Sequence, residues 1–163
     1  MPTSVLVILA AGAVLVLLAF LSRRPRVAGE WPFYARKPLS IPEQVMYHRL
    51  VKSLPQCMIL AQVQASRLLG VKRGYDFHRW ANRINRLSVD YVVCHRDSTV
   101  IAAIELDDAS HHARDRAEAD WRKERAFKAA GVPLLRWSVR DLPDEAAIRA
   151  ALEPVLNRPV ATP

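Results

Sequence analysis

The chain has 163 residues, of which 51% are hydrophobic, and its formal net charge is +8. This length fits one domain with an appendage, and the hydrophobic share is enough for a real core. The positive charge suits nucleic acid, an anionic membrane surface or an acidic protein partner, and the net charge alone does not choose among them. The two cysteines, Cys57 and Cys94, show no Cys/His zinc spacing, so we expect reduced core thiols and no zinc site.

The N-terminal segment is strongly apolar. Residues 2–22 carry no charged side chain, and about twenty helical residues at ~1.5 Å each span the ~30 Å hydrocarbon layer of a bilayer. Arg23, Arg24 and Arg26 follow at once, so the positive-inside rule places the C-terminal side in the cytoplasm. We predict a transmembrane anchor at residues 1–22, with the lipid bilayer as the partner of residues 2–22. A cleaved signal peptide is the alternative, although it normally has a basic first region and a shorter apolar stretch.

The rest of the chain divides into three parts. Residues 23–38 mix proline, charged and aromatic side chains and predict a juxtamembrane linker. Residues 39–156 alternate helical and strand patterns and predict one α/β domain. Residues 157–163 predict a disordered tail.

The α/β domain is expected to begin with a helix. In residues 40–43, SIPE, the serine suits the N-cap, the proline the first turn and the glutamate the third position of a capping box. This helix should run to Leu54, where Pro55 ends it, with core contacts that include Val45 and Val51.

The remaining elements are expected in this order: a strand at residues 58–63, a basic turn at 70–74, a short basic helix at 77–85, strands at 88–95 and 99–107 joined by a tight turn at 96–98, a helix at 113–130, a strand at 134–139 and a helix at 144–156. Gly131 suits the C-cap of the long helix. The order helix, three strands, helix, strand, helix predicts an α/β fold around a mixed sheet.

Two carboxylates face each other on the expected hairpin. Side chains alternate along a strand, and a turn centred between Asp97 and Ser98 pairs Asp90 with Glu105, with Cβ atoms ~4.5–5.5 Å apart. Two acids at so short a distance repel each other and lose hydration. Such a pair therefore shares a proton, pairs with a cation or binds a metal. Asp107 lies one pleat beyond Glu105. A loop of odd length would instead place Asp90 and Glu105 on opposite faces. The competing interpretation is that these acids lie solvated at strand ends and have no role in a site.

The sequence VDYVVC, followed by IAAIELDDASHHARDRAEADWRKERAFKAAGVPLLRW, resembles a known pattern. It is similar to the bacterial domain-of-unknown-function family 2726, in the PD-(D/E)XK restriction-endonuclease-like superfamily and allied to the very-short-patch-repair endonucleases. The resemblance covers about residues 35–152 and implies a restriction-endonuclease-like core. With the anchor, it implies a single-pass protein of the bacterial inner membrane whose C-terminal domain is cytoplasmic.

The resemblance assigns roles to several acids. Asp90 falls at the motif aspartate, Glu105 at the first acid of the (D/E)-X-K element, and Glu43 at the acid of the first helix. In that superfamily these acids hold a divalent cation, Mg²⁺ or Mn²⁺. The lysine position is occupied by Asp107. Related enzymes that lack this lysine use histidine, so the resemblance makes His111 a candidate catalytic residue together with Asp90, Glu105 and Asp107.

Two of these assignments have a competing explanation. Glu43 is equally well explained as a capping-box glutamate. Asp120 and Lys123, on the expected long helix, are candidates for supporting the site, and Lys123 could replace the missing lysine. A solvated helix, in which Asp120 pairs with Arg116 or Arg122, is the commoner arrangement.

A basic cluster forms a second candidate site. Tyr75, Phe77 and Trp80 lie within it, and lysine and arginine neutralise phosphates while aromatic rings stack on bases. The expected nucleic-acid-binding residues are Lys72, Arg73, Arg79, Arg83 and Arg86. The same cluster beside a bilayer could instead bind anionic headgroups.

The sequence therefore predicts a membrane-anchored, metal-dependent nuclease-like domain that hydrolyses phosphodiester bonds of DNA or RNA. The alternative is a catalytically inactive nucleic-acid-binding module, or a membrane-proximal scaffold, with the same fold. The missing lysine favours the alternative, and the paired acids favour the enzyme. The sequence indicates neither the oligomeric state nor a choice between DNA and RNA.

Overall fold

The computed structural model describes residues 3–21, 31–107 and 114–156. The chain divides into two units, Met1–Arg36 and Lys37–Pro163. The expected tail at residues 157–163 and residues 23–30 of the expected linker lie outside the described residues.

The first unit contains helix α1 (Thr3–Leu21), whose 19 residues include no charged side chain. The side chains of this helix are described at residue 7 and residues 9–19, and the apolar ones among them are exposed. A search of the described residues finds no helix with the length and hydropathy that crossing a membrane requires. The expected transmembrane anchor at residues 1–22 is therefore not supported by the structure.

The second unit is built on one mixed sheet of four strands in the order β1-β2-β3-β4. β1 (Met58–Gln64), β2 (Ser88–Cys94) and β3 (Val100–Asp107) are antiparallel neighbours, and β4 (Leu134–Ser138) runs parallel to β3. A parallel pair needs a crossover connection, and this one contains α5 (Arg114–Ala129). The predicted α/β class and the mixed sheet are confirmed.

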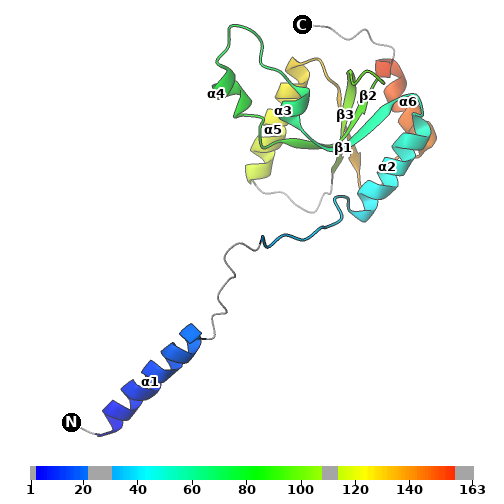
Figure 1. Ribbon diagram of the computed structural model, residues 1–163. Helices are drawn as coiled ribbons and strands as arrows, with labels where there is room; N and C mark the ends of the chain where they lie inside the picture. Colours follow the sequence, from blue (N-terminus) through cyan, green and yellow to red (C-terminus); the bar gives the residue numbers. More distant parts are fainter. Residues whose placement is uncertain (1–2, 22–30, 108–113, 157–163) are drawn as a thin grey trace. The chain divides into compact units, whose positions relative to one another are not determined.

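Helices cover both faces of the sheet (Figure 1). α2 (Ile41–Ser53) and α6 (Glu145–Leu156) lie side by side on one face. α3 (Ala65–Leu68), α4 (Phe77–Ala81) and α5 lie on the other face. A core forms on each face: Met46, Leu50, Leu54, Tyr91, Val93, Ile104, Ile148 and Leu152 under α2 and α6, and Ala65, Ile84, Leu87, Val92, Ala103 and Phe127 under α3 and α5.

α2 begins as the sequence predicts but buries a different face. The backbone N–H of Ser40 donates to the Glu43 carboxylate, which satisfies one of the donors that the first turn leaves free. Met46 and Leu50 are fully buried, whereas Val45 and Val51 are 39% and 43% exposed, so the expected contacts of the two valines are wrong. Residues four apart share one helical face, and the pair that meets the sheet is Met46 and Leu50.

The loop between β2 and β3 comprises the expected residues 96–98, but its centre is not the one assumed for the register. The backbone N–H of His95 donates to the Thr99 carbonyl, and residues 96–98 form the loop between them. Ser98 has a φ of 71°, the left-handed conformation that is typical of three-residue hairpin loops. The loop therefore has an odd length, which by itself would place the two acids of the hairpin on opposite faces.

A bulge in β3 restores the register. Cys94 pairs with Val100, and the next pair skips Ile101, so this residue has no partner of its own in the ladder. One extra residue on one strand offsets the odd loop. Beyond the bulge the pairing follows the predicted register, in which Asp90 lies beside Glu105.

Two short helices lie between β1 and β2. The sequence did not predict α3, and α4 ends at Ala81 rather than near residue 85. Asp76 caps α4 by accepting a hydrogen bond from the Arg79 N–H at 3.0 Å. Helices of four or five residues are too short for a periodic pattern to reveal them, which explains both differences.

Candidate functional site

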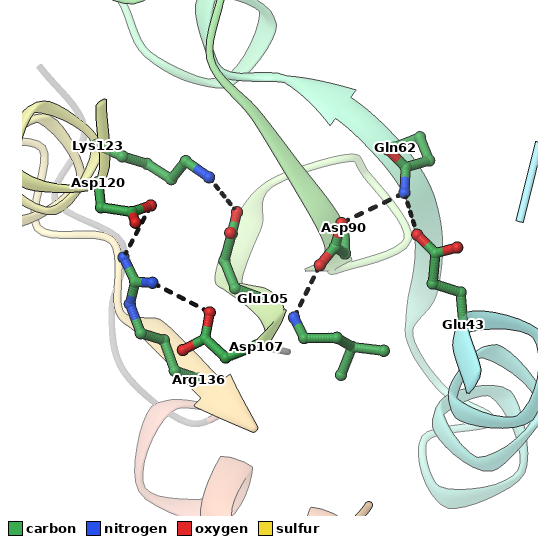
Figure 2. A network of polar contacts seen from close by, with 9 residues as sticks. Glu43, Gln62, Asp90, Glu105, Asp107, Asp120, Lys123 and Arg136 are labelled. Carbon is green, nitrogen blue, oxygen red and sulfur yellow. Dashed lines mark hydrogen bonds and ion pairs between the residues drawn. The ribbon is translucent and has the colours of Figure 1, made fainter. Parts of the chain in front are cut away.

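Asp90 on β2 and Glu105 on β3 lie on neighbouring strands. Alternation along the strands puts both acids on the face that α5 covers, beside Val92 and Ala103 of the core. Glu105 is buried and Asp90 is partly exposed, so the two acids lie at the polar border of that core. Figure 2 shows the polar side chains around them.

Among the described residues, two donors hold Asp90. The Leu106 N–H donates to Oδ2 at 2.7 Å, and Nε2 of Gln62 donates to Oδ1 at 3.3 Å. Burial raises the pKa of Asp90 above its ordinary value, the hydrogen bond from Leu106 opposes this change, and the negative charge of Glu43 adds to it. The protein therefore compensates the charge of this carboxylate only in part.

Gln62 links Asp90 to Glu43, and no pattern in the sequence singles it out. Its side-chain nitrogen lies 2.6 Å from Oε1 of Glu43 and 3.3 Å from Oδ1 of Asp90. The backbone of Gln62 has a φ of 54°, and the ladder between β1 and β2 skips this position. A left-handed conformation costs a residue other than glycine about 1–2 kcal/mol. Such a strained conformation persists where surrounding contacts hold the residue in place. Here the side-chain amide of Gln62 donates to the carboxylates of Glu43 and Asp90.

Glu43 makes its capping contact and its site contact at the same time. Oε2 accepts from the Ser40 N–H, and Oε1 accepts from Gln62. The hydroxyl of Tyr91 donates to the backbone carbonyl of Glu43, which fastens the first turn of α2 to β2. Local capping therefore accounts for one oxygen of Glu43, and the other oxygen is directed toward the neighbourhood of Asp90 (Figure 2).

Glu105 is paired with a lysine from α5. Nζ of Lys123 lies 2.7 Å from Oε1 of Glu105, and the two side chains are 10% and 11% exposed, respectively. Burial raises the pKa of Glu105, the ammonium of Lys123 opposes this change, and the charge of Asp90 adds to it. The sequence placed Lys123 near the site only by its proximity along the chain. The structure brings its ammonium into direct contact with the acid of β3.

Asp107 and Asp120 share a different cation. Arg136 on β4 lies 3.3 Å from Oδ1 of Asp107 and 3.7 Å from Oδ1 of Asp120. All three side chains are partly exposed, so these ion pairs add little stability. Asp120 pairs with Arg136 because α5 packs against β4 and brings the aspartate within reach of that arginine. Of the two partners weighed from the sequence, Arg122 makes no ion pair with Asp120 among the described side chains, and the side chain of Arg116 lies outside them.

The network carries an excess of negative charge. Five carboxylates stand against two cations among the side chains drawn in Figure 2. Within the described part of the chain, however, no group of three or more His, Cys, Asp or Glu side chains is arranged to hold a metal ion. The expected ligand set of Asp90, Glu105 and Glu43 is not assembled there, because Gln62 lies between Glu43 and Asp90. Asp90 and Glu105 still fit Mg²⁺, which one or two carboxylates commonly bind together with waters.

Other predicted residues lie apart from this network or cannot be placed. His111 lies outside the described residues. The basic residues expected to bind nucleic acid come from α4 and the segments beside it, on the same side of the sheet as α5 (Figure 1). All of them are exposed: Lys72, Arg73, Arg79, Arg83 and Arg86.

Comparison with known proteins identifies one family. Its model, described as a protein of unknown function (DUF2726), matches residues 35–155. The match spans nearly the whole second unit, including every described residue of the carboxylate network, and the chain belongs to this family. No curated protein and no solved structure matches the chain.

Proposed function

We propose that this member of the DUF2726 family is a metal-dependent nuclease that hydrolyses phosphodiester bonds of DNA or RNA. The proposal includes a PD-(D/E)XK core allied to the very-short-patch-repair endonucleases. One observation carries it: the buried contact of Lys123 with Glu105, beside Asp90 on the next strand. This arrangement supports the proposal because two carboxylates and one ammonium come together, as that chemistry requires, although Asp107 occupies the usual lysine position.

The roles follow from the contacts of each side chain. Asp90 and Glu105 would hold Mg²⁺ or Mn²⁺, which would polarise the phosphodiester and lower the pKa of a bound water. The raised pKa of each acid supports this role, because both have lost hydration that a cation could replace. Lys123 would stabilise negative charge that develops on the phosphate. Gln62 would hold Asp90 in position through Oδ1.

A cleavage assay on the full chain tests the proposal. The protein, purified in a neutral detergent, is incubated with labelled single- and double-stranded DNA and RNA, with Mg²⁺, with Mn²⁺ or with a chelator. We expect metal-dependent cleavage that falls about 100-fold or more in Asp90→Asn and in Lys123→Met, since removing one stabilising charge typically has this effect. Glu118→Gln, which removes an exposed carboxylate from α5, is the matched control and should retain activity.

Thermal unfolding of each variant separates a lost activity from a lost fold. Cleavage by the wild type that persists undiminished in Asp90→Asn would reject the assignment of the site. The absence of cleavage of all four substrates by a folded wild-type chain would reject the nuclease itself.

A catalytically inactive binding module is the second candidate. Two observations favour it: the residue at position 107 is aspartate, and its charge is already countered by Arg136 at 3.3 Å. Glu105 is likewise occupied by Lys123. Salt-sensitive binding of nucleic acid without cleavage, in the same assay, would support this candidate.

Attachment to a membrane through α1 is a separate proposal. It rests on the sequence, because residues 2–22 carry no charge and three arginines follow at positions 23, 24 and 26. The side chains of Val7, Leu9 and Leu15 on α1 are exposed within their unit, and exposed apolar surface of this kind is typical of a membrane or protein contact. With this orientation the second unit would face the cytoplasm.

A further inference from the structure

A groove runs between α5 and the segment that contains α4. Its volume is about 620 Å³, within the range of ligand sites. Tyr75 and Trp80 line it from the α4 segment and Trp121 lines it from α5. The three side chains are 60%, 41% and 54% exposed, so the groove offers accessible aromatic surface.

The groove is also strongly basic. Lys72, Arg83, Arg122 and Arg125 line it, and none of the described residues on its walls is acidic. Two of the arginines stack on the aromatic rings: Cζ of Arg83 lies 4.4 Å from the ring centroid of Trp80, and Cζ of Arg125 lies 4.8 Å from that of Trp121. Each wall therefore presents a planar ring with a cation attached to it.

Arg122 adds a polar atom that lacks a partner. Its Nε is buried and has no hydrogen-bond acceptor among the described residues. Arg122 also lines the groove, where its positive charge complements the anionic oxygens of a ligand. A ligand that supplies such oxygens beside flat apolar faces complements the whole groove.

We propose that this groove binds single-stranded nucleic acid, with unstacked bases on Trp80 and Trp121 and phosphates on the arginines. An anionic lipid headgroup would satisfy the cations but has no planar face for the rings. A duplex keeps its bases stacked and cannot use the rings either. The inference names the substrate class of the proposed nuclease and rests on that function only for the chemistry at the carboxylates.

The groove and the carboxylate network share one helix. Arg122 lines the groove, whereas the next residue, Lys123, contacts Glu105 on β3. The two sites therefore lie on neighbouring faces of α5.

Binding is measured without cleavage. Fluorescence anisotropy measures the affinity of the full chain for a labelled oligothymidylate of about 16 nucleotides and for the matched duplex. The protein is kept in neutral detergent, and a chelator is present. We expect the single strand to bind more tightly than the duplex. Trp80→Ala and Trp121→Ala should each weaken single-strand binding by about 5- to 150-fold, the range measured for lost base stacking. Trp121→Phe should restore part of the loss, because phenylalanine keeps a stacking face.

Matched controls test the role of the groove itself. Trp31→Ala removes an exposed aromatic outside the second unit, and Arg96→Ala removes a cation at the hairpin loop. Both should retain binding within about twofold, allowing for the general electrostatic term. Equal affinity for single strand and duplex, or tryptophan variants that bind like the wild type, would overturn the inference.

Competition separates a nucleotide from a lipid headgroup. Thymidine monophosphate should displace the labelled strand at lower concentration than glycerophosphoserine does, and equal displacement would overturn the inference. Because the chelator suppresses cleavage, a failure of binding counts against the groove alone. A failure of cleavage with intact binding counts against the proposed nuclease alone.

Discussion

Nζ of Lys123 lies 2.7 Å from Oε1 of Glu105, and about nine-tenths of each side chain is buried. The ion pair joins α5 to β3 across the core that contains Phe127 and Ala103. Buried ion pairs contribute little net stability, but the removal of one partner leaves an uncompensated charge. Replacing only one partner of this ion pair should therefore lower the stability of the fold much more than replacing both partners.

Lys123→Met should lower the free energy of unfolding by about 3–5 kcal/mol at neutral pH, because it leaves Glu105 buried without its cation. Thermal or denaturant unfolding of the full chain measures this loss. The double variant Glu105→Gln with Lys123→Met should recover most of it, since no charge then remains unpaired. A double variant as unstable as the single one would show that packing, rather than charge, dominates at this position.

Asp90→Asn should raise the melting temperature at neutral pH. Burial raises the pKa of Asp90 in the folded chain, so the folded state binds the proton more tightly than the unfolded state does. Wild-type stability therefore falls as the pH rises from about 4 through the raised pKa, and asparagine removes this penalty. The gain should shrink below a pH of about 4, where the carboxyl is protonated in both states.

Asp97→Asn is the matched control with the opposite sign. Hydrogen bonds from Thr99 lower the pKa of Asp97, so its charged form stabilises the loop above its ordinary pKa. Neutralising Asp97 should therefore lower the melting temperature at neutral pH, and this effect should vanish in acid. A rise in both variants would contradict the explanation from burial.

Gln62→Gly should be more stable than Gln62→Ala by about 1 kcal/mol. Both variants lose the amide that donates to Glu43 and Asp90. Only glycine adopts a φ of 54° without steric cost, and its greater freedom in the unfolded chain offsets part of the gain. Equal unfolding free energies would show that the backbone relaxes when the amide is removed. If Gln62 positions Asp90, the two variants should lose cleavage equally.

Ser98→Gly should stabilise the hairpin by about 0.5 kcal/mol, because Ser98 has a φ of 71° that glycine adopts more easily. The melting temperature of the full chain measures the effect. Arg96→Gly, in the same loop but at a residue with negative φ, should be neutral or destabilising.

Membrane attachment is tested by replacing two residues of α1. We expect the wild-type chain to remain in the membrane fraction of a bacterial host after alkaline carbonate extraction. Val14→Arg with Leu15→Arg should release it, because each arginine near the centre of a span costs about 2.5–3.5 kcal/mol. Val14→Ala with Leu15→Ala is the control and should stay bound. A wild-type chain that carbonate extracts completely would reject the anchor.

The register of the hairpin was predicted correctly although the assumed centre of the turn was wrong. The sequence suggested an even turn centred between Asp97 and Ser98, whereas the structure has a three-residue loop followed by a bulge at Ile101. The two deviations cancel, so Asp90 still lies beside Glu105. Alternating apolar side chains specify which face is buried, and this demand selects the register whatever the loop length is.

The parts of the site that escaped prediction depend on tertiary packing. Nothing in the local sequence distinguishes Gln62 from an outward-facing polar residue, since its role follows from a φ of 54° and from two acids on other elements. The contact of Lys123 likewise requires α5 to pack on β3. Arg136 forms ion pairs with Asp107 and Asp120 because β4 runs parallel beside β3. The spacing of these residues along the chain does not reveal that pairing.

The ammonium of the site comes from Lys123 on α5 and not from the sheet, so its position depends on the motion of that helix. A lysine on β3 would stay with the acids for as long as the sheet exists, but Lys123 stays only while α5 is docked. Local opening of α5 would remove the positive charge and leave Asp90 and Glu105 in place. The rate of amide hydrogen exchange in α5, rather than global unfolding, should then show the conditions under which the site loses the Lys123 ammonium.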